Sequence, residues 1–146
     1  LDHAGHDAGA DATAAEQGMS VEHPFADHIA LVVAEQRSGH SRLTLQVAPH
    51  HLNPHGVVHG AVLFALADTG MGSALYPTLA AGESCATIEV KINYFRPVRH
   101  GLLSCETTLV NRGKSVANLE SRVMLDGKIV ASANGNYAIL RPQAAG

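Results

Sequence analysis

Hydrophobic and polar residues alternate along several segments of the chain, and this period of two predicts β-strands with one buried face. Every second residue is apolar in 41–47, and 87–95 alternates in the same way. The compact apolar run 29–35 is separated from 41–47 by a short turn at Gly39, so we expect these two strands to form a hairpin. Three later segments predict further strands, at 102–110, 115–125 and 128–140.

A different pattern runs from Gly60 to about Tyr76, where apolar residues occupy all sides of a predicted helix that ends near Pro77. A helix that is hydrophobic all round is buried, and its many Ala and Gly residues allow another backbone to approach closely. A short helical turn is expected at 20–27, ahead of the first strand. This order of elements predicts an α+β fold, in which one antiparallel sheet wraps around one long helix.

The composition is that of a single globular domain. The chain has 146 residues, of which 46% are hydrophobic and 16% are charged. Residues 1–18 are rich in Ala, Gly and Asp and cannot bury a face, so we expect a flexible N-terminal extension or tag before one domain at 19–146. The net charge of −3 argues against nucleic acid as a partner.

Neither a membrane span nor a secretory signal is expected. The longest apolar run, 56–67, is broken by Asp68 and is shorter than the ~20 residues that a bilayer requires. The two cysteines, Cys85 and Cys105, are too few for a disulfide framework. We therefore expect the protein in the cytoplasm.

Asp68 is the main chemical anomaly, because it lies in the middle of the apolar helix. A buried carboxylate needs a partner, since burying an unpaired charge is costly. The ordinary interpretation is that this face meets water or that a backbone group donates to the carboxylate. The apolar surroundings favour the alternative, a general base or nucleophile.

The segment 53–60 leads into the helix and offers a second candidate site. Gly60 at a helix N-terminus leaves N–H groups free to bind an oxyanion or a phosphate, although an ordinary entry turn has the same sequence. His51, His55 and His59 are four residues apart, as in some helical zinc sites, but Pro54 and Gly56 break the helix that such a site needs. We therefore expect no metal.

A basic turn, Arg112-Gly113-Lys114-Ser115, joins two predicted strands. It suits phosphate binding through charge and backbone N–H groups, or it is a solvated hairpin turn. The sequence lacks the Walker, GxSxG and GxGxxG motifs.

These motifs together are similar to the signature of hotdog-fold acyl-CoA thioesterases. The resemblance rests on Asn53, His59-Gly60 and Asp68, followed by the strand Thr87-Ile88-Glu89-Val90-Lys91-Ile92-Asn93-Tyr94 and the basic turn at 112–115. It covers about 22–140 and is closest to the branch of the phenylacetate-pathway and Arthrobacter-type 4-hydroxybenzoyl-CoA enzymes. One departure is Ala61, where relatives usually have a second Gly.

The resemblance implies a role for each matching residue. Asp68 would be the base or nucleophile, the Gly60 N–H the oxyanion donor, and Thr87 would help to place the attacking water. Asn53 and His59 would shape the same pocket. The coenzyme A part of the substrate would lie along Glu89, Tyr94, Asn111, Arg112, Gly113, Lys114, Ser115 and Val116, with the phosphates near Arg112 and Lys114. No separate cofactor is implied.

The helix geometry adds a constraint on assembly. Gly60 and Asp68 are eight residues apart, so their backbones lie ~12 Å apart on one helix, and one thioester carbon cannot touch both. We therefore expect an obligate homodimer with two shared sites. A homotetramer made of two such dimers is a separate expectation that this geometry does not give, and its packing mode stays open. The acyl group stays open between aryl and medium-chain groups. Two rival functions are a non-catalytic acyl-CoA binding module and a hotdog dehydratase or hydratase that uses His59.

Overall fold

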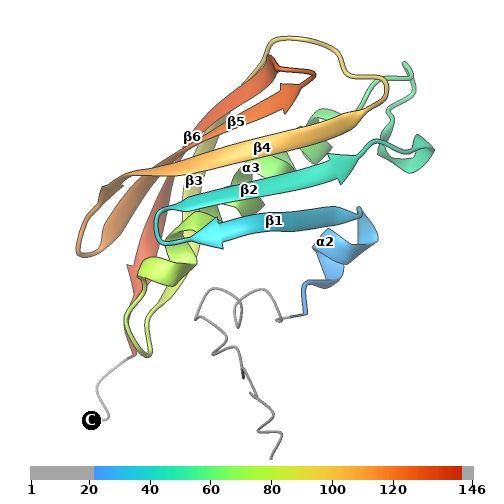
Figure 1. Ribbon diagram of the computed structural model, residues 1–146. Helices are drawn as coiled ribbons and strands as arrows, with labels where there is room; N and C mark the ends of the chain where they lie inside the picture. Colours follow the sequence, from blue (N-terminus) through green and yellow to red (C-terminus); the bar gives the residue numbers. More distant parts are fainter. Residues whose placement is uncertain (1–21, 143–146) are drawn as a thin grey trace, which may run out of the picture.

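One sheet of six antiparallel strands curls around the long helix α3 in the computed structural model (Figure 1). The structure describes residues 22–142, so the predicted extension at 1–18 lies outside the described part of the chain. The strand order is β1-β2-β4-β5-β6-β3, which puts β1 and β3 at the two edges. The elements are α2 (Pro24–His28), β1 (Leu31–Arg37), β2 (His40–Gln46), the 3-10 turn η1 (Pro49–His51), α3 (Gly60–Leu75), η2 (Tyr76–Thr78), β3 (Ser84–Tyr94), β4 (Leu102–Arg112), β5 (Val116–Leu125) and β6 (Lys128–Leu140).

The predicted α+β architecture, hotdog fold included, is confirmed. Each predicted strand has an observed counterpart whose ends differ by at most three residues, and β1 and β2 form the expected hairpin. The helical turn expected at 20–27 is α2, which begins later, at Pro24. His23 caps it, because its Nδ1 accepts the N–H of Ala26 at 3.1 Å.

One face of α3 packs against the inner face of the sheet. Leu66, Met71 and Leu75 are completely buried there, and the leucines and valines that alternate along β2, β4 and β5 fill the other side. The contact is close at Gly70, where an added Cβ would lie 2.5 Å from Thr107 Oγ1. The small residues of the helix therefore serve its approach to the sheet.

Polar side chains of the sheet fix α3 in its position. Ser41 Oγ donates to the Gly70 carbonyl at 2.7 Å, and Ser121 Oγ donates to the Ala67 carbonyl at 3.0 Å. These bonds give the buried Ser41 hydroxyl a partner, and the Ser121 hydroxyl also lies 2.6 Å from Thr107 Oγ1.

The opposite face of α3 is open within one chain, so a single chain does not bury the helix on all sides as the sequence predicts. Ala61 is exposed, and Phe64, Asp68, Gly72 and Ser73 are only partly buried. The physical reason is that the curled sheet covers one side of the helix, while only the edge elements α2, β1 and β3 border the other side (Figure 1).

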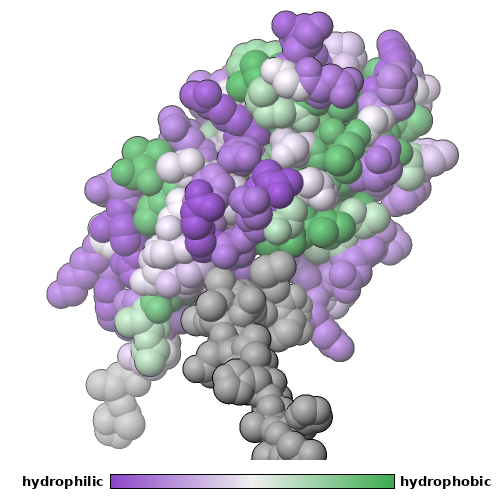
Figure 2. Space-filling view, in the orientation of Figure 1, coloured by the Kyte–Doolittle hydropathy of each residue, from purple (hydrophilic) through white to green (hydrophobic). Residues whose placement is uncertain are grey.

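The outer surface differs between the two edges of the sheet. On the face shown in Figure 2, hydrophilic side chains lie over the middle and hydrophobic ones gather toward the right side. At the β1–β2 edge, Glu35 pairs with Arg42 at 3.1 Å. Along the other edge, β3 is mostly exposed, and at least half of the surface of Ile88, Tyr94 and Phe95 is accessible. Among residues 22–142, no helix is both long and apolar enough to cross a bilayer.

Candidate active site

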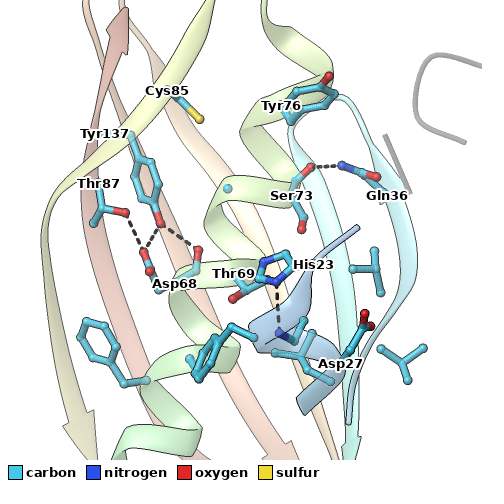
Figure 3. A pocket seen from close by; sticks show the side chains of 18 of the residues that line it. His23, Asp27, Gln36, Asp68, Thr69, Ser73, Tyr76, Cys85, Thr87 and Tyr137 are labelled. Carbon is cyan, nitrogen blue, oxygen red and sulfur yellow. Dashed lines mark hydrogen bonds between the residues drawn. The ribbon is translucent and has the colours of Figure 1, made fainter. Parts of the chain in front are cut away.

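The Asp68 carboxylate is held between two hydroxyl groups at the edge of a groove (Figure 3). Thr87 Oγ1 donates to Asp68 Oδ1 at 2.9 Å, and the Tyr137 hydroxyl donates to the same oxygen. The other carboxylate oxygen, Oδ2, has no hydrogen-bond donor among residues 22–142. Asp68 is therefore oriented by side chains, with one oxygen available to a molecule in the groove.

Strand register brings these two hydroxyls together. Thr87 of β3 lies directly opposite Tyr137 of β6, and both side chains point toward α3. A β-bulge directly after Thr87, between that residue and Glu89, interrupts the ladder at this point, as bulges often do beside functional sites.

Tyr137 is a site residue that the sequence analysis missed. Its side chain is only 3% exposed, and its hydroxyl also lies 2.8 Å from the Asp68 carbonyl oxygen. Burial, followed by the hydrogen bond to Asp68, raises the pKa of Tyr137 well above its ordinary value, so the phenol stays protonated and donates. The signal for it was a phenol at an inward position of the last strand, because a buried hydroxyl needs a partner.

The groove beside Asp68 has a volume of about 890 Å³ and is bordered by α2, β1, α3 and β3. Much of its lining is apolar, with Phe25 and Val32 on one side and Phe64 on the helix. Cys85 lines it next to Asp68, and burial together with that carboxylate raises the pKa of the Cys85 thiol. The thiol is therefore protonated near neutral pH and is a poor nucleophile.

The N-terminus of α3 forms a second, smaller hollow. The Gly60 N–H has no hydrogen-bond acceptor among residues 22–142, whereas the next N–H, of Ala61, is accepted by His59 Nδ1 at 2.9 Å. A hollow of about 340 Å³ lies here between Gly60, Tyr94 and the segment that follows Tyr94. Tyr94 donates to the Gly60 carbonyl at 3.1 Å and so fixes this end of the helix. The free N–H suits an oxygen that gains negative charge.

Asn53 and His51 shape the loop that leads to Gly60. Asn53 Oδ1 accepts the N–H groups of His55 and Val57 at 2.9 and 3.4 Å. His51 is buried, with Nδ1 accepting from the Ala48 N–H and Nε2 within 2.7 Å of the Ile29 carbonyl. Among the residues that the structure describes, no three His, Cys, Asp or Glu side chains are placed to hold a metal ion.

The basic turn between β4 and β5 lies at the other end of α3, beside η2 (Figure 1). Arg112 faces inward, donating to Thr78 Oγ1 at 3.2 Å and to Glu83 at 3.3 Å. Gly113 packs so tightly that an added Cβ would lie 2.4 Å from the Val116 carbonyl oxygen. The exposed residues of the turn are Asn111, Lys114, Ser115 and Val116.

Glu89 also lies apart from Asp68. Its carboxylate accepts the side-chain N–H of Asn136 at 2.9 Å, and Asn136 neighbours Tyr137 in β6 and therefore points to the opposite face of the sheet. Within one chain, the predicted site residues thus fall into separate groups. One lies at the start of α3, one at its middle and one at its end, and Asp68 meets only Thr87 of the residues predicted to join it.

Comparison with known proteins gives a consistent picture. Residues 55–131 match the thioesterase superfamily. A protein from Archaeoglobus fulgidus, named as a candidate esterase, is 30% identical over 105 residues, which cover 70% of this chain and 66% of that protein. A Haemophilus influenzae relative with the same name is 33% identical over 73 residues, half of this chain and 53% of that one. The chain thus spans about half to two thirds of these two curated relatives.

Solved structures agree with the fold. The conserved protein PA5202 from Pseudomonas aeruginosa has a TM-score of 0.77 at 29% identity, covering 85% of this chain and 98% of its own. The phenylacetic acid degradation protein PaaI from Thermus thermophilus, solved as a mutant, has a TM-score of 0.75 at 26% identity, covering 80% and 98%. The thioesterase HI1161 from Haemophilus influenzae shares the fold, with a TM-score of 0.78 at 22% identity, covering 86% and 87%.

Proposed function

Because this chain belongs to the thioesterase superfamily, we propose that it hydrolyses acyl-CoA thioesters to the free acid and CoA. The observation that supports this most is the Asp68 carboxylate, oriented by two hydroxyls with Oδ2 open to a largely apolar groove. A carboxylate held in this way can act as a general base or as a nucleophile toward a carbonyl carbon.

In the base pathway, Asp68 takes a proton from water as the water oxygen bonds to the thioester carbon. The carbonyl electron pair moves onto oxygen, where the Gly60 N–H stabilises the charge. Collapse of this intermediate breaks the C–S bond, and the departing thiolate receives the proton from Asp68. In the nucleophile pathway, Asp68 itself displaces CoA to give a mixed anhydride, which water then cleaves. The base contributes about 10²–10⁴-fold and the oxyanion donor about 10²–10³-fold.

The two groups act on one substrate only if two subunits share the site. Gly60 and Asp68 are eight residues apart on α3, so their backbones are ~12 Å apart at ~1.5 Å per residue. Two helices related by a two-fold axis bring Asp68 of one chain to Gly60 of the other, twice per dimer. The open face of α3 and the exposed edge of β3 agree with such a contact. We propose that these dimers pair further into tetramers.

The same arrangement supports a position for the substrate. The acyl group occupies the apolar groove, which suits an aryl or a medium-chain group. The CoA arm runs past Tyr94, Asn53 and His59 of one chain and reaches the 111–116 turn of the other chain, where Lys114 meets the phosphates, because these two groups lie at opposite ends of α3 within a single chain. Arg112 takes part only if it leaves Glu83 and Thr78.

The test is a panel of about a dozen acyl-CoA esters, aryl-acetyl and hydroxybenzoyl esters included, assayed for free thiol. At least one ester should be cleaved with normal saturation kinetics. Crotonyl-CoA is assayed in parallel by its enoyl absorbance. A loss of that absorbance without thiol release identifies a hydratase, and binding of esters without either change identifies a binding module; both outcomes reject the proposal.

A further inference from the structure

Tyr137 makes a contact that the hydrolysis mechanism above does not assign. Its hydroxyl is the one group of β6 that reaches the Asp68 carboxylate, and it comes from a side chain that is 3% exposed. Ser41 and Ser121 also donate to carbonyls of α3, but neither of their hydroxyls touches a side chain of the groove. Tyr137 therefore differs from these hydroxyls, because it contacts both the backbone and the carboxylate of the same residue.

We propose that Tyr137 is the positioning residue of the site, which clamps Asp68 Oδ1 so that Oδ2 faces the substrate. This inference rests on the proposed role of Asp68. The phenol has one proton to donate and two acceptors within reach. The Asp68 carbonyl has a regular donor in the N–H four residues further along the helix, and the carboxylate is the charged acceptor. The proton is therefore best placed on Oδ1.

The clamp works with Thr87, which donates to the same oxygen from β3. Two donors from two strands fix the carboxylate plane, so Asp68 keeps one orientation before the substrate arrives. Such preorganisation places the reacting oxygen without a cost at the moment of reaction. The other titratable groups that line this groove are Cys85 on β3, Tyr137 on β6, Tyr76 after α3 and, in or just before α2, Glu22, His23 and Asp27.

The test compares Tyr137→Phe with Ser121→Ala. The first removes the phenol hydroxyl, and the second removes a buried hydroxyl that bonds the Ala67 carbonyl, one residue before Asp68, and leaves the carboxylate untouched. We expect Tyr137→Phe to lower kcat about tenfold or more while KM changes less than twofold. Because the carboxylate loses a donor that fixes its plane, the loss should fall on kcat and not on KM. Ser121→Ala should keep the wild-type kcat and KM, whatever its effect on stability.

An activity-independent readout separates this proposal from the proposed function. The Asp68 carboxyl carbon is followed by NMR in protein labelled with ¹³C-aspartate and identified with Asp68→Asn. At neutral pH its chemical shift in Tyr137→Phe should differ from that of the wild type even if no acyl-CoA ester is cleaved, whereas Ser121→Ala should leave it unchanged. An unchanged Asp68 chemical shift in Tyr137→Phe would overturn the proposal.

A second measurement leaves position 137 intact, in case Tyr137→Phe does not fold. The hydroxyl proton of Tyr137 should change its chemical shift between the wild type and Asp68→Asn, because the two groups share a hydrogen bond. A hydroxyl resonance at the same position in both proteins would equally overturn the proposal.

Discussion

Mixing two inactive variants tests the shared site most sharply, and Gly60→Pro is the variant that the structure favours. Proline removes the Gly60 N–H, which has no acceptor among residues 22–142, so no internal bond is lost. Gly60 is the first residue of α3, where proline is well tolerated, and His59 before it has φ −60° and ψ 135°, which a following proline requires.

The expected loss in Gly60→Pro alone is about 10²–10³-fold in kcat, or about 2.7–4 kcal/mol of transition-state stabilisation. Gly60→Ala is the matched control, because it adds bulk but keeps the N–H. Its Cβ would lie 3.2 Å from the Tyr94 ring, a tight contact that asks the ring to move by a few tenths of an ångström. Gly60→Ala should therefore retain much more activity than Gly60→Pro.

The decisive assay uses Gly60→Pro and Asp68→Asn chains with different tags, expressed together and assayed for thiol release. Random pairing makes about half of the dimers mixed, and each mixed dimer has one intact and one doubly damaged site. The mixture should recover about one quarter of wild-type activity, and isolated mixed dimers about one half. If each chain carried its own complete site, mixing would restore nothing, and activity no higher than the average of the two variants would refute the reasoning.

Three further predictions concern ionisation and packing. Above pH ~10 an unfolded tyrosine loses its proton, whereas Tyr137 in the folded chain keeps its proton because its pKa is raised, so the free energy of unfolding falls as pH rises. In urea unfolding, the wild type should lose up to about 1.4 kcal/mol per pH unit more than Tyr137→Phe. Parallel plots of unfolding free energy against pH would contradict this. Burial raises the pKa of Cys85 and raises the pKa of Cys105 to about 12. Iodoacetamide at pH 8 should therefore alkylate both thiols slowly in the folded protein and quickly once it is unfolded, as measured by mass spectrometry. Rapid labelling of the folded protein would contradict this expectation. Gly70→Ala should destabilise the protein by about 1–3 kcal/mol, because its Cβ meets Thr107. Gly72→Ala, whose Cβ meets nothing within 4 Å in its own chain, should destabilise it less, and equal denaturation midpoints for the two variants would argue against this packing.

The sequence was sufficient for the fold because local patterns and burial agree along it. Alternation in β2, β4, β5 and β6 marks one buried face, and the Asp126-Gly127 turn fixes the last hairpin. The pattern of β3 alternates just as regularly, yet nearly the whole strand is exposed within one chain. Periodicity shows which residues share a face, and it does not show whether the same chain covers that face.

The site was predictable only in part. Asp68 could be singled out as a candidate because a carboxylate interrupts an apolar helix, and the structure brings Thr87, a second candidate, into contact with it. Tyr137 was missed because its contact depends on the register of β6 against β3, which no local pattern encodes. Arg112 carries the charge expected of a phosphate ligand, but the nearby Glu83 engages it, and pairing between segments 29 residues apart cannot be seen in the turn alone.

The most direct measurement is thiol release from the best acyl-CoA ester by Asp68→Asn, at equal concentration of folded protein. Asp126→Asn is the matched control, since Asp126 lies in an exposed turn with φ 49°, a conformation that asparagine adopts readily. We expect kcat to fall by about 10²–10⁴-fold in Asp68→Asn and to stay within twofold of wild type in Asp126→Asn. Near-wild-type turnover by a folded Asp68→Asn dimer would contradict the central claim that this carboxylate drives the hydrolysis.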